Sequence, residues 1–343
     1  MKKTLLLIAF FSLAIIINAQ KNFNLSRSEK RISYSSYNNF AFLDSRPNPD
    51  DMGFVLTSIF NKYTPVAVEK PLSEQFYYTF LSIIDSTAQS GTILVQLRNL
   101  RFREETGSTS EKGFCNIRMS LYEEKDSAFH FINTIDTIVM VKAMDVTGKL
   151  LETTSKIIVS QLRKNLAFRA EDYSMPFTLD DLANIDELEK NSIPIYNTDV
   201  VADGLYPDFK SFAYQTPSHT QLQIKRDHGI IQEIKIPHPE KSGKWKKIKP
   251  KDYYIVVVDS NPFLMHANSY FPIIFENGNY FVRTYIPNNN NVNINGIQIG
   301  LAVGFGMIGG LVGGLFFNTT TTGNGTELAT AKLDHINGDF IIQ

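Results

Sequence analysis

The run from Ile299 to Phe317 constrains this chain more than any other feature, because its 19 residues include no charged or polar side chain and seven glycines. As an α-helix it would be about 28 Å long, close to the ~30 Å hydrocarbon core of a bilayer. An exposed helix in water is not expected, because each glycine costs about 1 kcal/mol relative to alanine. The run must therefore be covered by lipid or by protein.

The spacing of the glycines favours lipid. Glycine recurs at every fourth residue in two series: Gly296, Gly300, Gly304 and Gly306, Gly310, Gly314. In a helix this spacing gives small-residue faces that allow close helix approach within a membrane. We expect residues 296–317 to insert as a transmembrane helix and to associate through a glycine-zipper face. The expected face consists of Gly300, Gly304, Gly306, Gly310 and Gly314. The alternatives are a segment that packs on the protein's own sheet and a pair of glycine-rich strands.

The N-terminus predicts export. A basic start, Met1-Lys2-Lys3, precedes an apolar stretch from Leu5 to Ile17 and a small residue at Ala19. This order is typical of a secretory signal peptide, residues 1–19, cleaved before Gln20. The alternative is an uncleaved anchor, although the apolar stretch is shorter than a membrane span requires. No cysteine lies near the cleavage point, so we expect no lipid attachment there.

Composition limits the remaining classes. The chain carries 34 basic and 35 acidic residues, and this near-neutral balance gives no attraction to nucleic acid. Cys115 is the only cysteine, so no internal disulfide is expected. A chain of 343 residues suits two domains.

The pattern of apolar and polar residues in the first half predicts an α+β domain over residues 20–168. A short strand, Phe40–Leu43, precedes a helix that starts after Pro71. Three strand-like runs follow; the first changes phase near Asn99, which suggests a bulge, and the second alternates cleanly from Cys115 to Leu121. A second helix is expected around residues 149–166. We predict two helices covering one face of an antiparallel sheet.

This half resembles the domain of auxiliary lipoproteins that serve ABC-type exporters. The matching features are the strand ending in Asp44-Ser45-Arg46, the helix Leu72–Gln89, the long sheet and the closing helix Leu151–Leu166. The lipid-bearing cysteine of that family is absent here. The whole chain also looks like uncharacterised secreted proteins of the Bacteroidota type, with an Ala-Gln signal ending and a late glycine-rich run. Both resemblances imply a place in the cell envelope.

The second half predicts a linker and a β-rich domain. Residues 169–192 are acidic, and Thr178 with Asp181 forms a capping pair for a short helix. Residues 193–343 contain short runs between turn signals, which predict a small antiparallel meander, curved or partly closed. Tyr253–Val258 is apolar throughout, and we expect it to be the central strand. Residues 326–343 are expected to form a hairpin.

Catalytic patterns are missing from the sequence. The six histidines stand in no paired metal-ligand spacing, and there is no phosphate-binding loop or nucleophile elbow. Cys115 lies on the apolar side of its strand, which favours an inert buried thiol. Asp44, Asp50 and Asp51 suit an ordinary turn better than a calcium loop. We therefore predict a non-enzymatic protein with no cofactor and no metal.

A basic segment near residue 245 contains the only tryptophan. Its members are Lys244, Trp245, Lys246, Lys247 and Lys249. One interpretation is a charged sheet edge that prevents aggregation. The other is contact with anionic lipid head groups or a partner, where each lysine adds ~1 kcal/mol near the surface.

Together these features predict an exported envelope protein, periplasmic or in the outer envelope, that associates with a membrane. The expected partners are membrane lipid, a second copy or another envelope protein, and not nucleic acid. Two alternatives stay open: a soluble periplasmic binding module whose glycine-rich segment packs on its own sheet, and an enzyme with a dispersed interdomain site.

Overall fold

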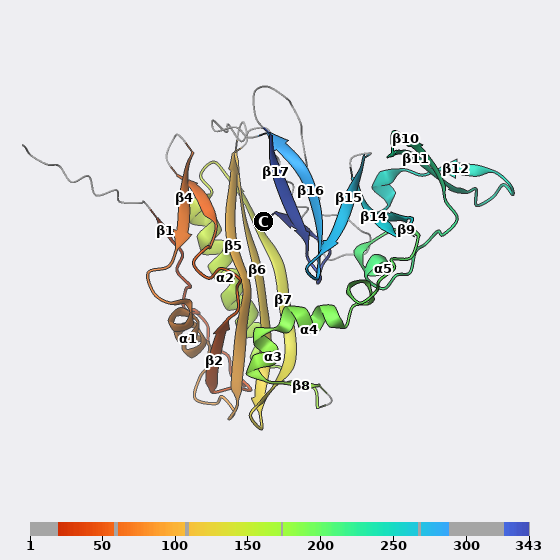
Figure 1. Cartoon of the computed structure of the whole chain (residues 1–343). Helices are drawn as coiled ribbons and strands as arrows, with labels where there is room; N and C mark the ends of the chain where they lie inside the picture. The colour runs from red at the N-terminus through yellow and green to blue at the C-terminus, as the bar shows by residue number, and fades with distance from the viewer. Residues whose placement is uncertain are drawn as a thin grey trace, which may run out of the picture. The chain divides into compact units, whose positions relative to one another are not determined.

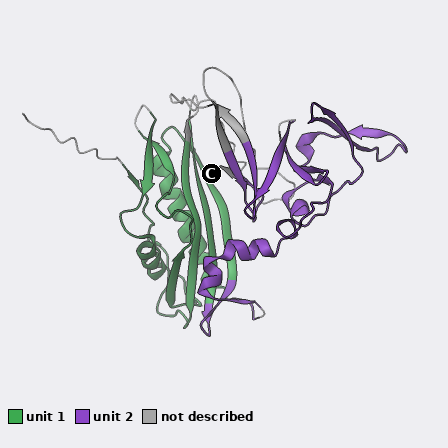
Figure 2. Cartoon of the chain, in the orientation of Figure 1, with its two compact units in different colours: residues 1–105, 109–123, 132–169 green, residues 106–108, 124–131, 170–343 purple. Residues whose placement is uncertain are grey.

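The computed structural model describes residues 20–57, 61–106, 110–172, 174–266, 269–287 and 326–342. The expected signal peptide, residues 1–19, and the glycine-rich segment 296–317 with its association face lie outside these ranges. The chain forms two compact units (Figure 2). Unit 1 comprises residues 1–105, 109–123 and 132–169, and unit 2 comprises residues 106–108, 124–131 and 170–343. Residues 169–192, the expected linker, thus fall almost entirely in unit 2.

Unit 1 is an α+β fold with two helices on one side of a sheet (Figure 1). Its elements are β1 (Lys21–Asn22), β2 (Asn39–Asp44), β3 (Phe54–Thr57), β4 (Lys62–Ala67), α1 (Leu72–Ile83), β5 (Thr92–Thr106), β6 (Glu111–Lys125), β7 (Ala128–Ala143) and α2 (Thr147–Asn165). The main sheet has the order β2-β5-β6-β7-β8, where β8 is Pro176–Phe177, and β2 runs parallel to β5. A smaller sheet, β1-β4-β3, was not expected from the sequence.

Helix α1 forms where the sequence predicts it. Pro71 occupies the N-cap position, and the helix ends where Ile84 adopts extended backbone. Phe76, Phe80 and Ile83 recur at helical spacing and are fully or almost fully buried. They share one apolar core with α2 and the sheet, and this core fixes both helices to the same sheet face.

The expected phase change in β5 is confirmed. Val95 and Leu97 lie in the core, and so do Leu100 and Phe102, although the two sets are out of step by one residue. In β6, Cys115, Ile117, Met119 and Leu121 all enter the same core, as strict alternation requires. On the opposite side of β6, Arg118 hydrogen-bonds to Asp136, Ser120 to Thr134 and Tyr122 to Gln96.

Unit 2 is mostly β-structure with short helices. Its elements are β8 (Pro176–Phe177), α3 (Leu179–Ala183), α4 (Ile185–Asn191), η1 (Pro194–Tyr196), β9 (Gly204–Tyr206), α5 (Phe209–Ala213), β10 (Gln223–Asp227), β11 (Ile230–Pro237), β12 (Trp245–Lys247), η2 (Pro250–Asp252), β13 (Ile255–Val258), β14 (Asn261–His266), β15 (Ser269–Glu276), β16 (Asn279–Pro287), β17 (Thr326–Leu333) and β18 (Phe340–Ile342). The expected cap of α3 is present. The Thr178 side chain accepts a hydrogen bond from the Asp181 N–H, and the Asp181 side chain accepts one from the Thr178 N–H.

The antiparallel meander of unit 2 is confirmed. Seven strands have the order β18-β17-β16-β15-β14-β13-β9, and β10-β11-β12 form a separate sheet. The turn between β15 and β16 places Asn277 and Gly278 at φ of 49° and 70°, the signs that a type I′ turn needs. Residues 326–333 pair with β16, and the expected C-terminal hairpin of β17 and β18 forms one edge of the sheet.

The expectation that residues 253–258 form the central strand is wrong. Strand β13 is next to the edge strand β9. Its apolar sequence has a different cause, because both of its faces are covered. Ile255 and Val257 enter one core with the helices of unit 2, and Val256 and Val258 enter a second core with β11. The first of the short runs expected in this half, residues 193–196, is a 3-10 turn that starts at Pro194 and not a strand.

Candidate functional site

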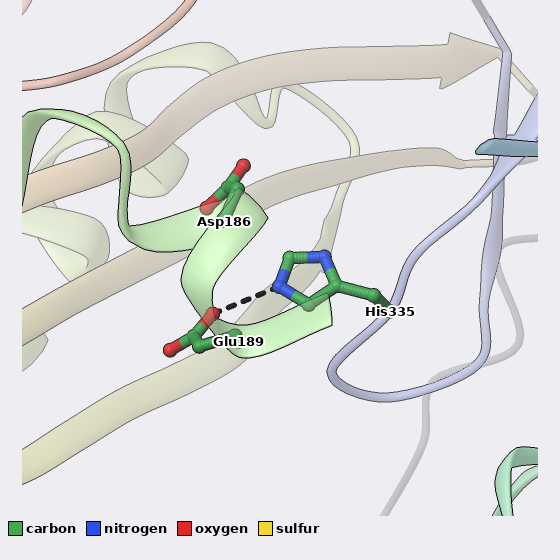
Figure 3. Close-up of side chains that lie close together, drawn as sticks. All are labelled: Asp186, Glu189 and His335. Atoms are coloured by element: carbon green, nitrogen blue, oxygen red, sulfur yellow. Dashed lines mark hydrogen bonds and ion pairs between the residues drawn. The ribbon is translucent and has the colours of Figure 1, made fainter. Parts of the chain in front are cut away.

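Three side chains with metal-binding chemistry meet within unit 2 (Figure 3). Asp186 and Glu189 stand three residues apart on α4, so they share one side of the helix. His335 comes from the turn between β17 and β18. Its Nε2 lies 2.8 Å from Glu189 Oε2. One ligand atom from each of the three residues lies within 4.8 Å of the others.

The turn that carries His335 is held tightly. The Asp334 N–H donates to the Asp339 carbonyl, and the Gly338 N–H donates to the Asp334 carbonyl. The Asp334 side chain accepts from the Ile336 N–H at 2.9 Å. Gly338 adopts φ of 81°, and a Cβ atom there would lie 2.3 Å from the Cβ of Phe209. These contacts allow only glycine at the corner and preset the imidazole of His335.

Helix α4 is held in place by the residues that flank this side. Ile185 is buried, and the Lys190 side chain is buried too, with only 4% of its surface exposed. Lys190 Nζ donates to Glu187 Oε1 at 2.7 Å and to Asn279 Oδ1 at 2.8 Å. The second bond ties the helix to the start of β16. Asp186 and Glu189 are therefore presented by a short helix that cannot rotate freely.

The surroundings contain charges of both signs. Burial lowers the pKa of Lys332, and the neighbouring charge of Lys190 lowers it further. Asp186 and Glu187 act in the opposite direction on the same lysine. The side chain of His335 is only 5% exposed and that of Glu189 is 33% exposed, whereas Asp186 is exposed. The cluster thus has a buried imidazole on one side and an opening to solvent at Asp186.

The donor set defines what this cluster can do. One imidazole nitrogen and two carboxylate oxygens are ligands that suit Zn²⁺ and similar divalent ions. Without an ion, the pair of Glu189 and His335 simply links α4 to the β17–β18 turn. The sequence analysis did not find this cluster, because Glu189 and His335 are 146 residues apart. The only local signal was two carboxylates at helical spacing in residues 186–189.

The basic segment that the sequence singled out lies elsewhere in unit 2, apart from this cluster. β12, with Trp245, Lys246 and Lys247, forms one edge of the three-stranded sheet, as the charged-edge interpretation requires. Lys247 Nζ lies 2.9 Å from Glu233 Oε2 on the neighbouring strand. Lys244 and Lys249 are also exposed. Contact of this edge with lipid stays a prediction.

The acidic turn of unit 1 is an ordinary turn. The Asp44 carboxylate accepts two hydrogen bonds from the Arg46 guanidinium, at 2.9 and 2.7 Å. The Asp51 carboxylate accepts from the Gly53 N–H and from Arg101. Arginine charges therefore already compensate two of the three carboxylates that a calcium site would use. Cys115 is fully buried, as its place on the apolar side of the strand predicts, and burial raises the pKa of its thiol.

Comparisons with known proteins add little to this geometry. No protein family and no curated protein matches the chain. Among solved structures, the crystal structure of the protein XCC0632 from Xanthomonas campestris, of the family DUF330, matches with 10% sequence identity. The match covers 43% of this chain and 92% of that protein, with a TM-score of 0.27. A likeness at this level carries no argument about fold or function.

Proposed function

We propose that this protein is exported to the cell envelope, is not an enzyme, and associates with a membrane through residues 296–317. Support for export comes from the order of basic, apolar and small residues in positions 1–19. Support for membrane association comes from the charge-free run 299–317 and from the strands that flank it. Among the described residues, no helix is both long and apolar enough to cross a membrane.

The pairing of β16 with β17 carries this proposal. The two strands are in antiparallel register from the pair Phe281 and Lys332 to the pair Pro287 and Thr326. Residues 288–325 therefore connect two adjacent strand ends. The apolar run 299–317 lies within this connection.

The pairing of β16 with β17 limits the ways in which the segment could enter the membrane. A chain that crosses a bilayer once has its two flanks on opposite sides, whereas β16 and β17 are paired with each other. A lone extended return through hydrocarbon would leave backbone groups without hydrogen bonds, at several kcal/mol each. We therefore propose that the segment enters and leaves on the same side. Glycines in the first half, such as Gly300 and Gly304, would then face Gly310 and Gly314 in the second half or in another copy.

The test replaces residues 296–317 with a Gly/Ser linker of equal length in the full chain. The native protein is expected in the membrane fraction after alkaline carbonate washing, and the replaced variant in the supernatant. The variant should keep the melting temperature of the native protein, because β16 and β17 remain paired. Native protein that is released without detergent would overturn membrane association and favour the soluble binding module.

The substitution Gly310→Leu distinguishes insertion of the segment into a membrane from packing of the segment against the protein's own sheet. The change adds apolar surface, so the protein should stay in the membrane fraction while cross-linking between copies decreases. If residue 310 is instead buried against the protein's own sheet, the same change overpacks that core and destabilises it by about 1–3 kcal/mol. A lower melting temperature of a fully soluble protein would therefore contradict the proposal.

Protein recovered from the envelope should begin at Gln20, and a sequence beginning at Met1 would count against export by a cleaved signal.

A further inference from the structure

We propose that Asp186, Glu189 and His335 bind one divalent transition-metal ion, with Zn²⁺ as the best match, and that the ion fastens α4 to the β17–β18 turn. The inference rests on described residues of unit 2 and is independent of the membrane proposal.

The distances are close to those of a bound ion. Tetrahedral zinc holds nitrogen and oxygen ligands at roughly 2.0–2.2 Å, which places the ligand atoms roughly 3.3–3.6 Å from one another. The three candidate atoms lie within 4.8 Å of one another, and His335 Nε2 and Glu189 Oε2 are 2.8 Å apart. Binding therefore requires Glu189 to move back slightly and the exposed Asp186 to rotate inward. The backbone of α4 and of the turn can stay where they are.

The ligand chemistry selects the class of ion. An imidazole nitrogen disfavours Mg²⁺ and Ca²⁺, which take oxygen ligands almost exclusively. The absence of a thiolate from this set disfavours Cu⁺. One imidazole with two carboxylates suits Zn²⁺, and the exposed side at Asp186 leaves room for a water molecule as a fourth ligand.

The site is more organised than a chance surface cluster. His335 is 5% exposed and stands in the turn that Gly338 and Asp334 fix. Among the described residues of unit 2, the buried ionisable side chains are Lys190, Asp334 and His335, so they are confined to this neighbourhood. Lys190 is engaged with Glu187 and Asn279 and does not occupy the cluster. A rigid imidazole beside two adjustable carboxylates is an arrangement that a metal ion can complete with little reorganisation.

The competing explanation is a hydrogen bond between Glu189 and His335 without any metal. Asp186→Asn distinguishes the two, because it removes one ligand and leaves that hydrogen bond intact. Asp180→Asn on α3 is the matched control, since it makes the same chemical change on the preceding helix outside the cluster.

The experiment uses the full-length protein after treatment with a chelator, titrated with ZnCl₂ in a calorimeter and melted with and without the ion. The native protein and Asp180→Asn are expected to bind one equivalent of Zn²⁺ and to gain melting temperature, and MgCl₂ should produce neither effect. Asp186→Asn is expected to bind at least about tenfold more weakly.

Equal Zn²⁺ affinity in native protein and Asp186→Asn would overturn the site, and so would the absence of binding to native protein. His335→Gln provides a second check: loss of the zinc-induced rise in melting temperature supports the proposal, and a rise equal to the native one contradicts it. Failure of this test leaves the membrane proposal standing, because its assay needs no metal.

Discussion

The two units bury polar groups in different ways. In unit 1 the buried guanidinium of Arg118 makes two hydrogen bonds to Asp136 on the next strand, at 3.0 and 2.9 Å. In unit 2 tyrosine hydroxyls reach distant carbonyl groups. Tyr254 donates to Gly338 at 2.6 Å, and Tyr280 donates to Ile195 at 2.8 Å. The Arg118 pair thus links neighbouring strands, whereas these two tyrosine hydroxyls of unit 2 join segments 84 and 85 residues apart in the sequence.

This difference indicates what each unit depends on. Breaking a buried ion pair leaves an uncompensated charge, which costs about 3–5 kcal/mol, whereas a neutral hydrogen bond contributes about 1 kcal/mol. Unit 1 gains its shape from long strands and two helices over one apolar core. Unit 2 has shorter elements and two smaller cores, so its long-range contacts decide which segments meet.

Truncation of the two cores should have the largest effect. Phe76 in unit 1 and Phe212 in unit 2 are both 0% exposed. Phe76→Ala and Phe212→Ala should each reduce the free energy of unfolding by about 3–5 kcal/mol. If the units fold independently, with their join in residues 169–192, calorimetry should show each variant lowering a different transition. Met144→Ala, at a 90% exposed side chain, is the control. One shared transition that both variants lower equally would show that the units unfold together.

A smaller effect is expected from the corner of the β17–β18 turn. Gly338→Ala combines left-handed backbone at φ of 81° with a clash against Phe209, and should destabilise unit 2 by about 1–3 kcal/mol. Gly229→Ala is the matched control, because its φ is 82° but nothing lies within 4 Å of the added Cβ. Urea unfolding should show Gly338→Ala to be clearly the less stable. Equal losses would mean that the turn relaxes and does not preset His335.

The smallest effect concerns pH and unit 1. Glu104 accepts hydrogen bonds from the Leu56 N–H and the Thr147 hydroxyl, and burial raises its pKa above the ordinary value of 4.5. A raised pKa means that the folded protein binds this proton more tightly than the unfolded chain. The stabilisation is complete below pH 4.5 and is lost as pH rises through the folded pKa.

Glu104→Gln keeps an oxygen that can accept both hydrogen bonds and removes the titration. Its free energy of unfolding should therefore fall less than that of the native protein between pH 4 and pH 7, as measured by urea unfolding. Glu240→Gln, at an exposed residue of unit 2, should follow the native curve. Parallel curves for native protein and Glu104→Gln would show that this carboxyl makes no contribution to the pH dependence.

The sequence predicts unit 1 better than unit 2 because its signals are local. Alternation in β6 and the phase change in β5 arise within single strands, and α1 repeats its apolar residues within three turns. The pair of strands β3 and β4 was missed although the two are neighbours in the sequence, since each is short. The wrong prediction that β13 is the central strand has a similar origin. An apolar run indicates that both faces of a strand are buried, but it does not indicate the position of the strand in its sheet.

The candidate metal site lay beyond sequence reasoning for a stronger reason. His335 and α4 meet only after the meander has formed and β17 has paired with β16. A histidine followed by Ile336 and Asn337 gives no sign of carboxylates that lie far away in the sequence. Spacing rules find ligands that share a helix or a loop, and here only Asp186 and Glu189 do.

The single cysteine has a kinetic consequence. Cys115 is 0% exposed in the core of unit 1, and the chain has no other thiol. A thiol reagent can react only when the sheet opens, so the modification rate under native conditions counts opening events of unit 1 alone. Fluctuations of unit 2 stay invisible to this reaction unless they loosen unit 1. The rate of Cys115 modification therefore measures whether changes in unit 2 alter the opening of unit 1.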